Sequence, residues 1–241
     1  YIHDTNTFLV YDSEDKLISR IDDAWSNSLD RNESSSFFPT DFIITRGFRF
    51  AAVDPWRACI SLWDRSLRQL NPIALDYDIE IRPVSICNGG DNSLFFINSS
   101  DNRVWELDRS MDVKPMTYLS SKLPTKNKYI QVRYLVNRNE VILLGSETLE
   151  KITLPGNFVK KHDVKSLSPK RFALFGDEIW ILGNRIECVN VINLERLYIS
   201  SIKNEFESIT DIIVPYKEIL YLLQNRGNYI TRMKIVRNSD H

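Results

Sequence analysis

Short apolar runs separated by polar turns recur along all 241 residues of the chain. In each repeat an apolar run leads into a polar turn and a second strand-like run follows, which is the pattern of a β-hairpin. The turns begin near positions 12, 54, 98, 145, 183 and 224, so the repeats are spaced by about 40 residues. This spacing is typical of a β-propeller blade made of four strands.

The first three hairpins also share a frame of eleven positions, at 12–22, 54–64 and 98–108. Asp or Asn opens the frame, a β-branched residue stands seventh and Asp closes it. The side chain of an opening Asp or Asn bonds readily to backbone amides two residues further on, so we expect these residues to hold the turns. The last three hairpins share only the spacing and the apolar pattern.

Further strands are expected on both sides of the hairpins. Apolar segments before five of the hairpins are predicted to be innermost strands, and segments after them to be outer edge strands. The inner segments are 42–45, 84–87, 133–136, 172–175 and 211–214, and examples of outer segments are 116–119 and 197–200. No long stretch has the 3.6-residue periodicity of a helix.

The sequence therefore predicts an all-β protein, a β-propeller of about six blades of four antiparallel strands, forming a single domain over residues 1–241. Only Tyr1 and Ile2 precede the first hairpin as an inner strand, and no outer strand follows Arg237. We therefore expect the first and last blades to be incomplete and the chain to be part of a longer polypeptide, since open sheet edges are normally avoided.

The frame resembles two repeat families. Residues 98–108, Asn-Ser-Ser-Asp-Asn-Arg-Val-Trp-Glu-Leu-Asp, resemble an NHL-type repeat, and Ile60-Ser-Leu-Trp-Asp64 resembles a WD repeat. The motifs are specific in about three of the six repeats, and the content of 8 glycines departs from both families. The resemblance implies a platform that binds proteins and, as in some NHL-type propellers, RNA.

Composition and charge limit the classes of protein to which the chain can belong. A hydrophobic content of 43% and a charged content of 26% fit a globular protein with a large core. The net charge of −1 disfavours a protein that grips nucleic acid over its whole face. No apolar run approaches the roughly 18–20 residues of a membrane span.

The cysteines and the possible glycosylation sites bear on where the protein is located. Cys59, Cys87 and Cys188 lie in apolar runs and are expected to be buried free thiols, which favours an intracellular location. Asn-x-Ser triplets at 32–34 and 98–100 keep secretion open.

Trp56 and Arg57 stand in a predicted turn, where small polar residues are the rule. Trp and Arg are enriched among the residues that dominate the energy of protein interfaces, so this pair is a candidate partner anchor. The alternative is that Trp56 folds down over its own blade.

Basic residues form two further clusters, both expected in connections between blades. A local basic patch there would attract nucleic acid or an acidic protein segment, and the alternative is a solvated loop balanced by acidic residues elsewhere. The first cluster comprises Lys160, Lys161, Lys165, Lys170 and Arg171, and the second comprises Lys122, Lys126 and Lys128.

Catalytic residues do not form a recognisable motif. His3, His162 and His241 are the only histidines, and His162 is expected to be an ordinary loop residue. No cofactor or metal site is predicted. The sequence predicts a non-enzymatic protein–protein interaction module or scaffold subunit, with an NHL-like nucleic-acid-binding propeller as the alternative. A minor alternative, suggested by resemblance to gluconolactonase-type propellers, is a metal-dependent lactonase using Asp12, Asp54 and Asn98.

Overall fold

The structure is a computed structural model, and it describes residues 8–11, 16–21, 39–45, 49–64, 66, 68, 70, 72–75, 80–120, 126–155, 158–200, 208–217, 219–224 and 229–236. Several predicted features lie outside these residues: the chain ends, Asp12, Lys122, and the triplet at 32–34.

Almost all regular structure in the described part of the chain is β-strand. Its elements, in chain order, are β1 Phe8–Tyr11, β2 Leu17–Ile21, β3 Asp41–Thr45, β4 Arg49–Asp54, β5 Cys59–Trp63, β6 Ile73–Ala74, β7 Pro83–Asn88, β8 Leu94–Asn98, β9 Arg103–Leu107, β10 Val113–Pro115, α1 Thr117–Ser120, β11 Tyr129–Leu135, β12 Glu140–Gly145, β13 Thr148–Thr153, β14 Phe158–Asp163, β15 Arg171–Phe175, β16 Glu178–Leu182, β17 Ile186–Asn190, β18 Arg196–Ile199, β19 Ile209–Tyr216, β20 Ile219–Gln224 and β21 Tyr229–Lys234, with short 3₁₀ turns at Val136–Arg138 and Lys165–Leu167.

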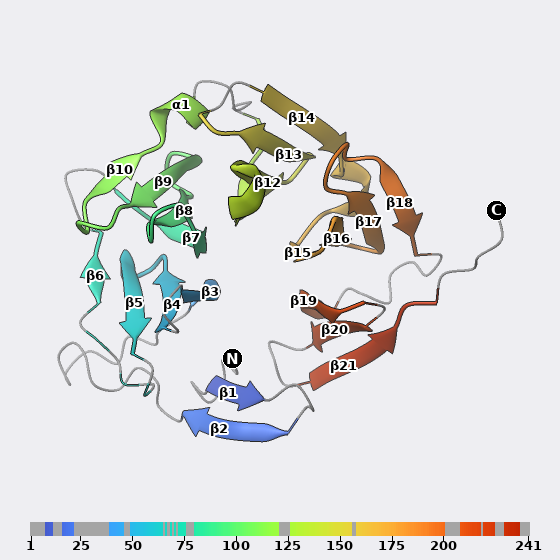
Figure 1. Ribbon diagram of the computed structural model, residues 1–241, viewed down its shortest axis with the longest axis horizontal. Helices are drawn as coiled ribbons and strands as arrows, with labels where there is room; N and C mark the ends of the chain where they lie inside the picture. The colour runs from blue at the N-terminus through green and yellow to red at the C-terminus, as the bar shows by residue number, and fades with distance from the viewer. Residues whose placement is uncertain are drawn as a thin grey trace. The chain divides into compact units, whose positions relative to one another are not determined.

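The strands form antiparallel sheets in simple chain order (Figure 1). Four sheets have four strands, namely β3 to β6, β7 to β10, β11 to β14 and β15 to β18, and β19 to β21 form a three-stranded sheet. The hairpin β1–β2 remains a two-stranded sheet. The expectation of about six four-stranded blades was therefore wrong in number: the structure has five blades of three or four strands. The sequence contains six hairpins, and each hairpin was taken to indicate one blade. The first hairpin, β1–β2, gains no further strand among the described residues and therefore does not form a blade of three or four strands.

The chain divides into two compact units, which are described separately. Unit 1 comprises Tyr1–Leu143 and Lys151–Val159, and unit 2 comprises Leu144–Glu150 and Lys160–His241. In unit 1 the innermost strands β3, β7 and β11 pack side by side, and in unit 2 β15 packs beside β19. The predicted inner strands are thus confirmed.

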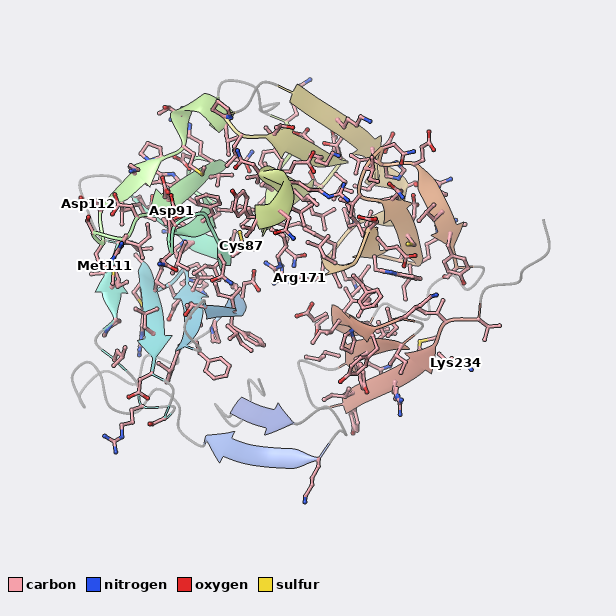
Figure 2. All side chains as sticks on the ribbon, in the orientation of Figure 1. Cys87, Asp91, Met111, Asp112, Arg171 and Lys234 are labelled. Carbon is pink, nitrogen blue, oxygen red and sulfur yellow. The ribbon has the colours of Figure 1, made fainter. Side chains whose placement is uncertain are left out.

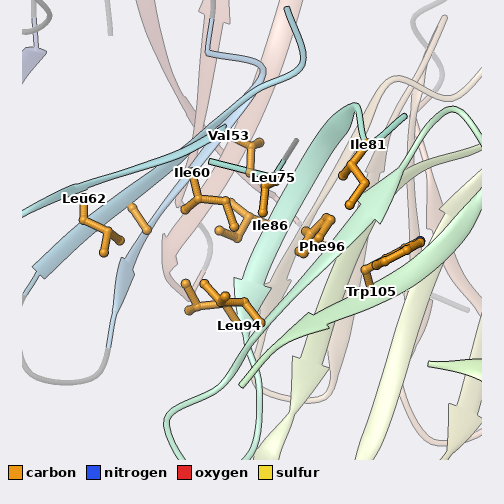
Figure 3. Close-up of a cluster of buried hydrophobic side chains, with 11 residues drawn as sticks. Val53, Ile60, Leu62, Leu75, Ile81, Ile86, Leu94, Phe96 and Trp105 are labelled. Carbon is orange, nitrogen blue, oxygen red and sulfur yellow. The ribbon is translucent and has the colours of Figure 1, made fainter. Parts of the chain in front are cut away.

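Apolar side chains of neighbouring sheets interdigitate to form the cores. In unit 1, one cluster joins the β3–β6 and β7–β10 sheets through Ile60, Leu75, Ile86 and Phe96, all essentially inaccessible to water (Figure 3). In unit 2 a corresponding cluster centred on Trp180 joins the β15–β18 sheet to β19 and β20. Strands buried on both faces read as continuous apolar runs, which is why these hairpins were visible in the sequence.

Two segments differ from the sequence prediction. Residues 116–119 were expected to be an outer strand, but Thr117–Ser120 form a short helix. Met116 and Leu119 are both buried, and helical geometry places side chains three apart on one face. The outer strand is instead β10. Conversely, Phe158–Asp163 were not predicted as a strand, because Lys-Lys-His-Asp looks like a loop; lysine is, however, common on the exposed edge strands of sheets.

Candidate functional site

The turn between β4 and β5 presents Trp56 to solvent on a rigid support. Asp54 is completely buried, and its Oδ1 atom accepts hydrogen bonds from the amides of Trp56 at 2.8 Å and Arg57 at 3.1 Å. Trp56 itself is 77% exposed, whereas Trp63, Trp105 and Trp180 are at most 4% exposed. Trp56 therefore does not fold down over its own blade. The expected role of the opening Asp in holding the turn is confirmed.

Arg57 behaves differently from its neighbour. Its side chain is 23% exposed, and its Nε atom lies 4.0 Å from Oδ2 of Asp54. The arginine thus lies against the carboxylate of its own turn. The two residues that the sequence grouped as one anchor are separated by the structure: Trp56 projects, and Arg57 stays at the base of the turn.

The predicted basic cluster belongs to unit 2 and is balanced by acceptors. Lys161 Nζ lies 3.4 Å from the buried carboxylate of Glu150, and Lys165 Nζ lies 3.3 Å from Glu147. Lys170 Nζ donates to the carbonyl of Ile209 at 3.1 Å. Lys160 and Arg171 are half-buried. Lys160 and Lys161 also stand in strand β14 rather than in a connection between blades, which corrects the expected placement.

The other predicted basic residues lie in unit 1. Lys126 and Lys128 are exposed in the segment between α1 and β11, which is a connection between sheets as expected.

His162 is a strand residue rather than a loop residue, and it contacts a buried carboxylate. Its Nε2 atom lies 2.6 Å from Oε1 of Glu187, and Nε of Arg196 donates to the same oxygen at 2.9 Å. Burial raises the pKa of Glu187, but the hydrogen bonds from His162 and Arg196 outweigh it and hold the pKa below its ordinary value. The group links β14, β17 and β18, and sequence reasoning missed it because its members are far apart in the chain.

Replacing Glu187 by glutamine should destabilise the protein at neutral pH by about 2 kcal/mol, because two charge-assisted hydrogen bonds are weakened. The native pKa is depressed, so the stabilisation is present above the ordinary value of 4.5 and is lost as the pH falls through the native pKa. Urea unfolding of wild type and Glu187→Gln across this range should show the difference shrinking in acid. Glu195→Gln, at an exposed turn, is the control, and a difference that does not vary with pH would contradict the assignment.

Asp41 forms the centre of a polar cluster where three inner strands of unit 1 meet. Its Oδ2 atom accepts from Ser85 Oγ at 2.6 Å, from the Ile86 amide at 3.1 Å and from Arg133 Nη1 at 3.1 Å. Ser85 Oγ in turn accepts from the Val132 amide at 3.1 Å. Each contact joins residues more than 40 positions apart, so the cluster connects β3, β7 and β11 in the absence of sheet pairing between them.

Two hollows lie at the other end of the unit 1 strands from the Trp56 turn. One, of about 690 Å³, is lined by Leu62, Leu94 and Leu107 with Asp64 and Asp108. The other, of about 680 Å³, shares Asp108 and Arg109 with the first. Hydrogen bonding, chiefly from the Asp112 amide, holds the pKa of Asp108 below its ordinary value, so this carboxylate stays ionised. The hollows combine apolar walls with fixed charge, and in the sequence Asp64 and Asp108 stood out only as the residues that close the repeat frame.

The three cysteines are free and buried, as predicted. Burial raises the pKa of Cys59 to about 11 and of Cys87 to about 12, so both remain protonated and weakly nucleophilic (Figure 2 labels Cys87). Asn98 Oδ1 accepts from the Arg82 and Ser100 amides, which gives it a turn role like that of Asp54. Within the described ranges no group of three His, Cys, Asp or Glu residues is placed to hold a metal ion, and no helix is long and apolar enough to cross a membrane.

Comparison with known proteins relates the chain to solved structures but not to a sequence family. No family model matches the chain, and no curated protein matches it. A structure of a nidogen/laminin complex aligns with a TM-score of 0.71 at 12% identity over 95% of this chain and 85% of the other. Virginiamycin B lyase from Staphylococcus aureus, in a catalytically inactive form with quinupristin, aligns with a TM-score of 0.65 at 12% identity over 97% of this chain and 89% of the other.

The chain is a β-propeller. The predicted fold class and its likeness to repeat propellers are confirmed at the level of the fold. The prediction that the protein is not an enzyme was wrong as an inference from this fold, because structures that share it include a lyase. A missing catalytic motif in the sequence is therefore no argument against catalysis on this fold, because catalytic groups can converge from distant parts of a chain.

Proposed function

We propose that this propeller is a protein-interaction module that docks a partner protein on the Trp56 turn. The observation that carries the proposal is a tryptophan exposed to 77% on a turn whose main chain is fixed by a fully buried aspartate. The nidogen/laminin complex, which aligns with this chain, supports the general idea that the fold serves protein association.

The residue type of Trp56 and the fixed main chain of its turn both favour binding of a partner at this position. Tryptophan is the residue type with the largest apolar surface to gain from burial, and it is strongly enriched among interface residues of high energetic weight. Because Asp54 already holds the turn, little main-chain entropy is lost when a partner closes over it. The burial of the tryptophan and the small loss of main-chain entropy both favour binding, and neither requires the turn to rearrange.

The basic cluster of unit 2 gives less support to a nucleic-acid partner. Lys161 and Lys165 have carboxylates of Glu150 and Glu147 within 3.4 Å, and Lys170 is bonded to a backbone carbonyl. Cations that already have anionic neighbours release fewer counterions on contact with phosphates, so they contribute less to nucleic-acid affinity.

Replacing Trp56 by alanine should weaken partner binding about 30-fold, corresponding to about 2 kcal/mol, while leaving the unfolding midpoint unchanged. The test is cross-linking of the tagged chain in cell extract, identification of captured proteins by mass spectrometry and measurement of each affinity by biolayer interferometry. Ile192→Ser, which removes a half-exposed aliphatic side chain from a turn of unit 2, is the matched control.

The proposal is supported if a captured protein binds the Ile192→Ser variant normally and the Trp56→Ala variant weakly. Equal binding of both variants by every captured protein would overturn it. Iodide quenching gives an independent measurement in a Trp25→Phe variant, in which the remaining tryptophans are exposed Trp56 and the buried Trp63, Trp105 and Trp180. A partner that covers the turn should remove the quenching that Trp56 contributes.

A further inference from the structure

The last sheet of unit 2 differs from the other blades in having an open third strand. In the four-stranded sheets the third strands β5, β9, β13 and β17 are largely buried. Strand β21 occupies the third place in its sheet, yet none of its six residues is buried. Its outer edge has no partner strand among the described residues.

This edge also differs from the edges of the other blades. The outer strands β6, β10 and β18 have two to four residues, and β14 carries Lys-Lys-His-Asp. Short or highly charged edges resist pairing with another chain, whereas a long edge with apolar side chains is a template for it. Strand β21 has six residues and exposes apolar side chains beside its two cations: Tyr229 is 62% and Ile230 is 51% exposed.

Charge indicates what kind of strand would pair there. A hollow of about 460 Å³ beside β20 and β21 is lined by Lys217, Arg232 and Lys234 together with Ile219 and Met233. Among the described residues that line this hollow, three are cations and none is an aspartate or glutamate. Arg232 and Lys234 are two residues apart, so they lie on the same face of the strand (Figure 2 labels Lys234).

We propose that β21 accepts an acidic, extended segment of a partner protein as a fourth strand of the β19–β21 sheet. The main chain of the segment would pair with the open edge, its apolar side chains would cover Ile230, and its carboxylates would meet Lys217, Arg232 and Lys234. Strand addition uses main-chain hydrogen bonds for affinity and side-chain contacts for specificity. The site is in unit 2 and is independent of the Trp56 turn.

The test uses a synthetic acidic peptide of roughly eight residues, alternating Glu with Val and Thr, added to the full chain. Hydrogen exchange followed by mass spectrometry should show protection of residues 229–234 when the peptide binds. The double variant Lys217→Glu/Lys234→Glu should weaken binding at least about tenfold. The matched control Lys126→Glu/Lys128→Glu makes the same change in net charge in unit 1 and should bind normally.

Several outcomes would overturn the proposal. They are no binding of the acidic peptide at millimolar concentration, equal binding of a peptide with Lys in place of Glu, and binding without protection of residues 229–234. Tighter binding of oligo-dT that depends on the same lysines would assign the surface to nucleic acid, and protection of β21 on self-association would assign it to a second copy of the chain. Trp56→Ala should leave peptide binding unchanged, so failure here is distinguishable from failure at the Trp56 turn.

Discussion

Replacing Asp41 by alanine is expected to lower the free energy of unfolding by about 4 kcal/mol, because breaking a buried ion pair leaves an uncompensated charge. The Arg133 guanidinium would lose its carboxylate partner while its side chain remains only 25% exposed. Ser85 would lose the acceptor for its hydroxyl proton, and the Ile86 amide would lose its hydrogen bond to the same carboxylate. Guanidinium chloride unfolding measures the effect.

A double-mutant cycle separates the lost ion pair from the general cost of changing the site. Arg133→Met removes the cation, so Asp41→Ala in that background should cost clearly less than in wild type. Equal costs in the two backgrounds would show that Asp41 acts through its hydrogen bonds with the Ser85 hydroxyl and the Ile86 amide and not through Arg133. Asp112→Ala, at an exposed position just before β10 in unit 1, controls for the loss of an aspartate.

Replacing Gly183 by alanine should destabilise the protein by about 3 kcal/mol, because the added methyl group has no space. A Cβ atom at this position would lie 2.1 Å from the backbone oxygen of Leu167 and 2.9 Å from its carbonyl carbon. The Leu167 oxygen also accepts the Asn184 amide at 2.7 Å, so the main chain cannot move away without losing that bond. The turn between β16 and β17 is thereby fixed against the connection between β14 and β15.

Gly90→Ala is the matched control for Gly183→Ala. Its Cβ would meet only the Tyr134 hydroxyl at 3.7 Å, which is ordinary contact, so the cost should stay below about 1 kcal/mol. Thermal unfolding of both variants tests the prediction. Equal midpoints for the two variants would mean that the Leu167 carbonyl shifts freely, contrary to the packing described above.

The parts of the fold that the sequence predicted are those encoded locally. Asp54 and Asn98 each accept a hydrogen bond from an amide two residues further on, so their turn role follows from neighbouring residues. The helix at Thr117–Ser120 could not be predicted in this way, because Met116 and Leu119 pack into a core formed by two sheets. That core depends on residues distant in the chain. Strand β14 was missed because its sequence is highly charged. Such a sequence forms a strand at the edge of a sheet, and the sheet order is not visible in the sequence.

At the candidate site, too, the contacts between residues distant in the chain could not be predicted from the sequence. The sequence left two alternatives for Trp56, projection from the turn or packing over its own blade, and the structure decides for projection. The contacts of Asp41 with Arg133, and of Glu187 with His162, join residues that are far apart in the chain and carry no signal in sequence spacing. The last blade was expected to lack an outer strand, and its sheet has three strands among the described residues. The exposure of the β21 side chains, in contrast, depends on tertiary structure.

Asp54 has a further consequence for how such a surface can change during evolution. Its carboxylate recognises main-chain amides, which every residue except proline provides, so the turn keeps its shape whatever side chain stands at position 56. Selection can therefore change the exposed side chain at position 56 with little cost in folding. A duplicated copy of the protein could acquire a new partner by one substitution at the tip, while the buried aspartate preserves the scaffold.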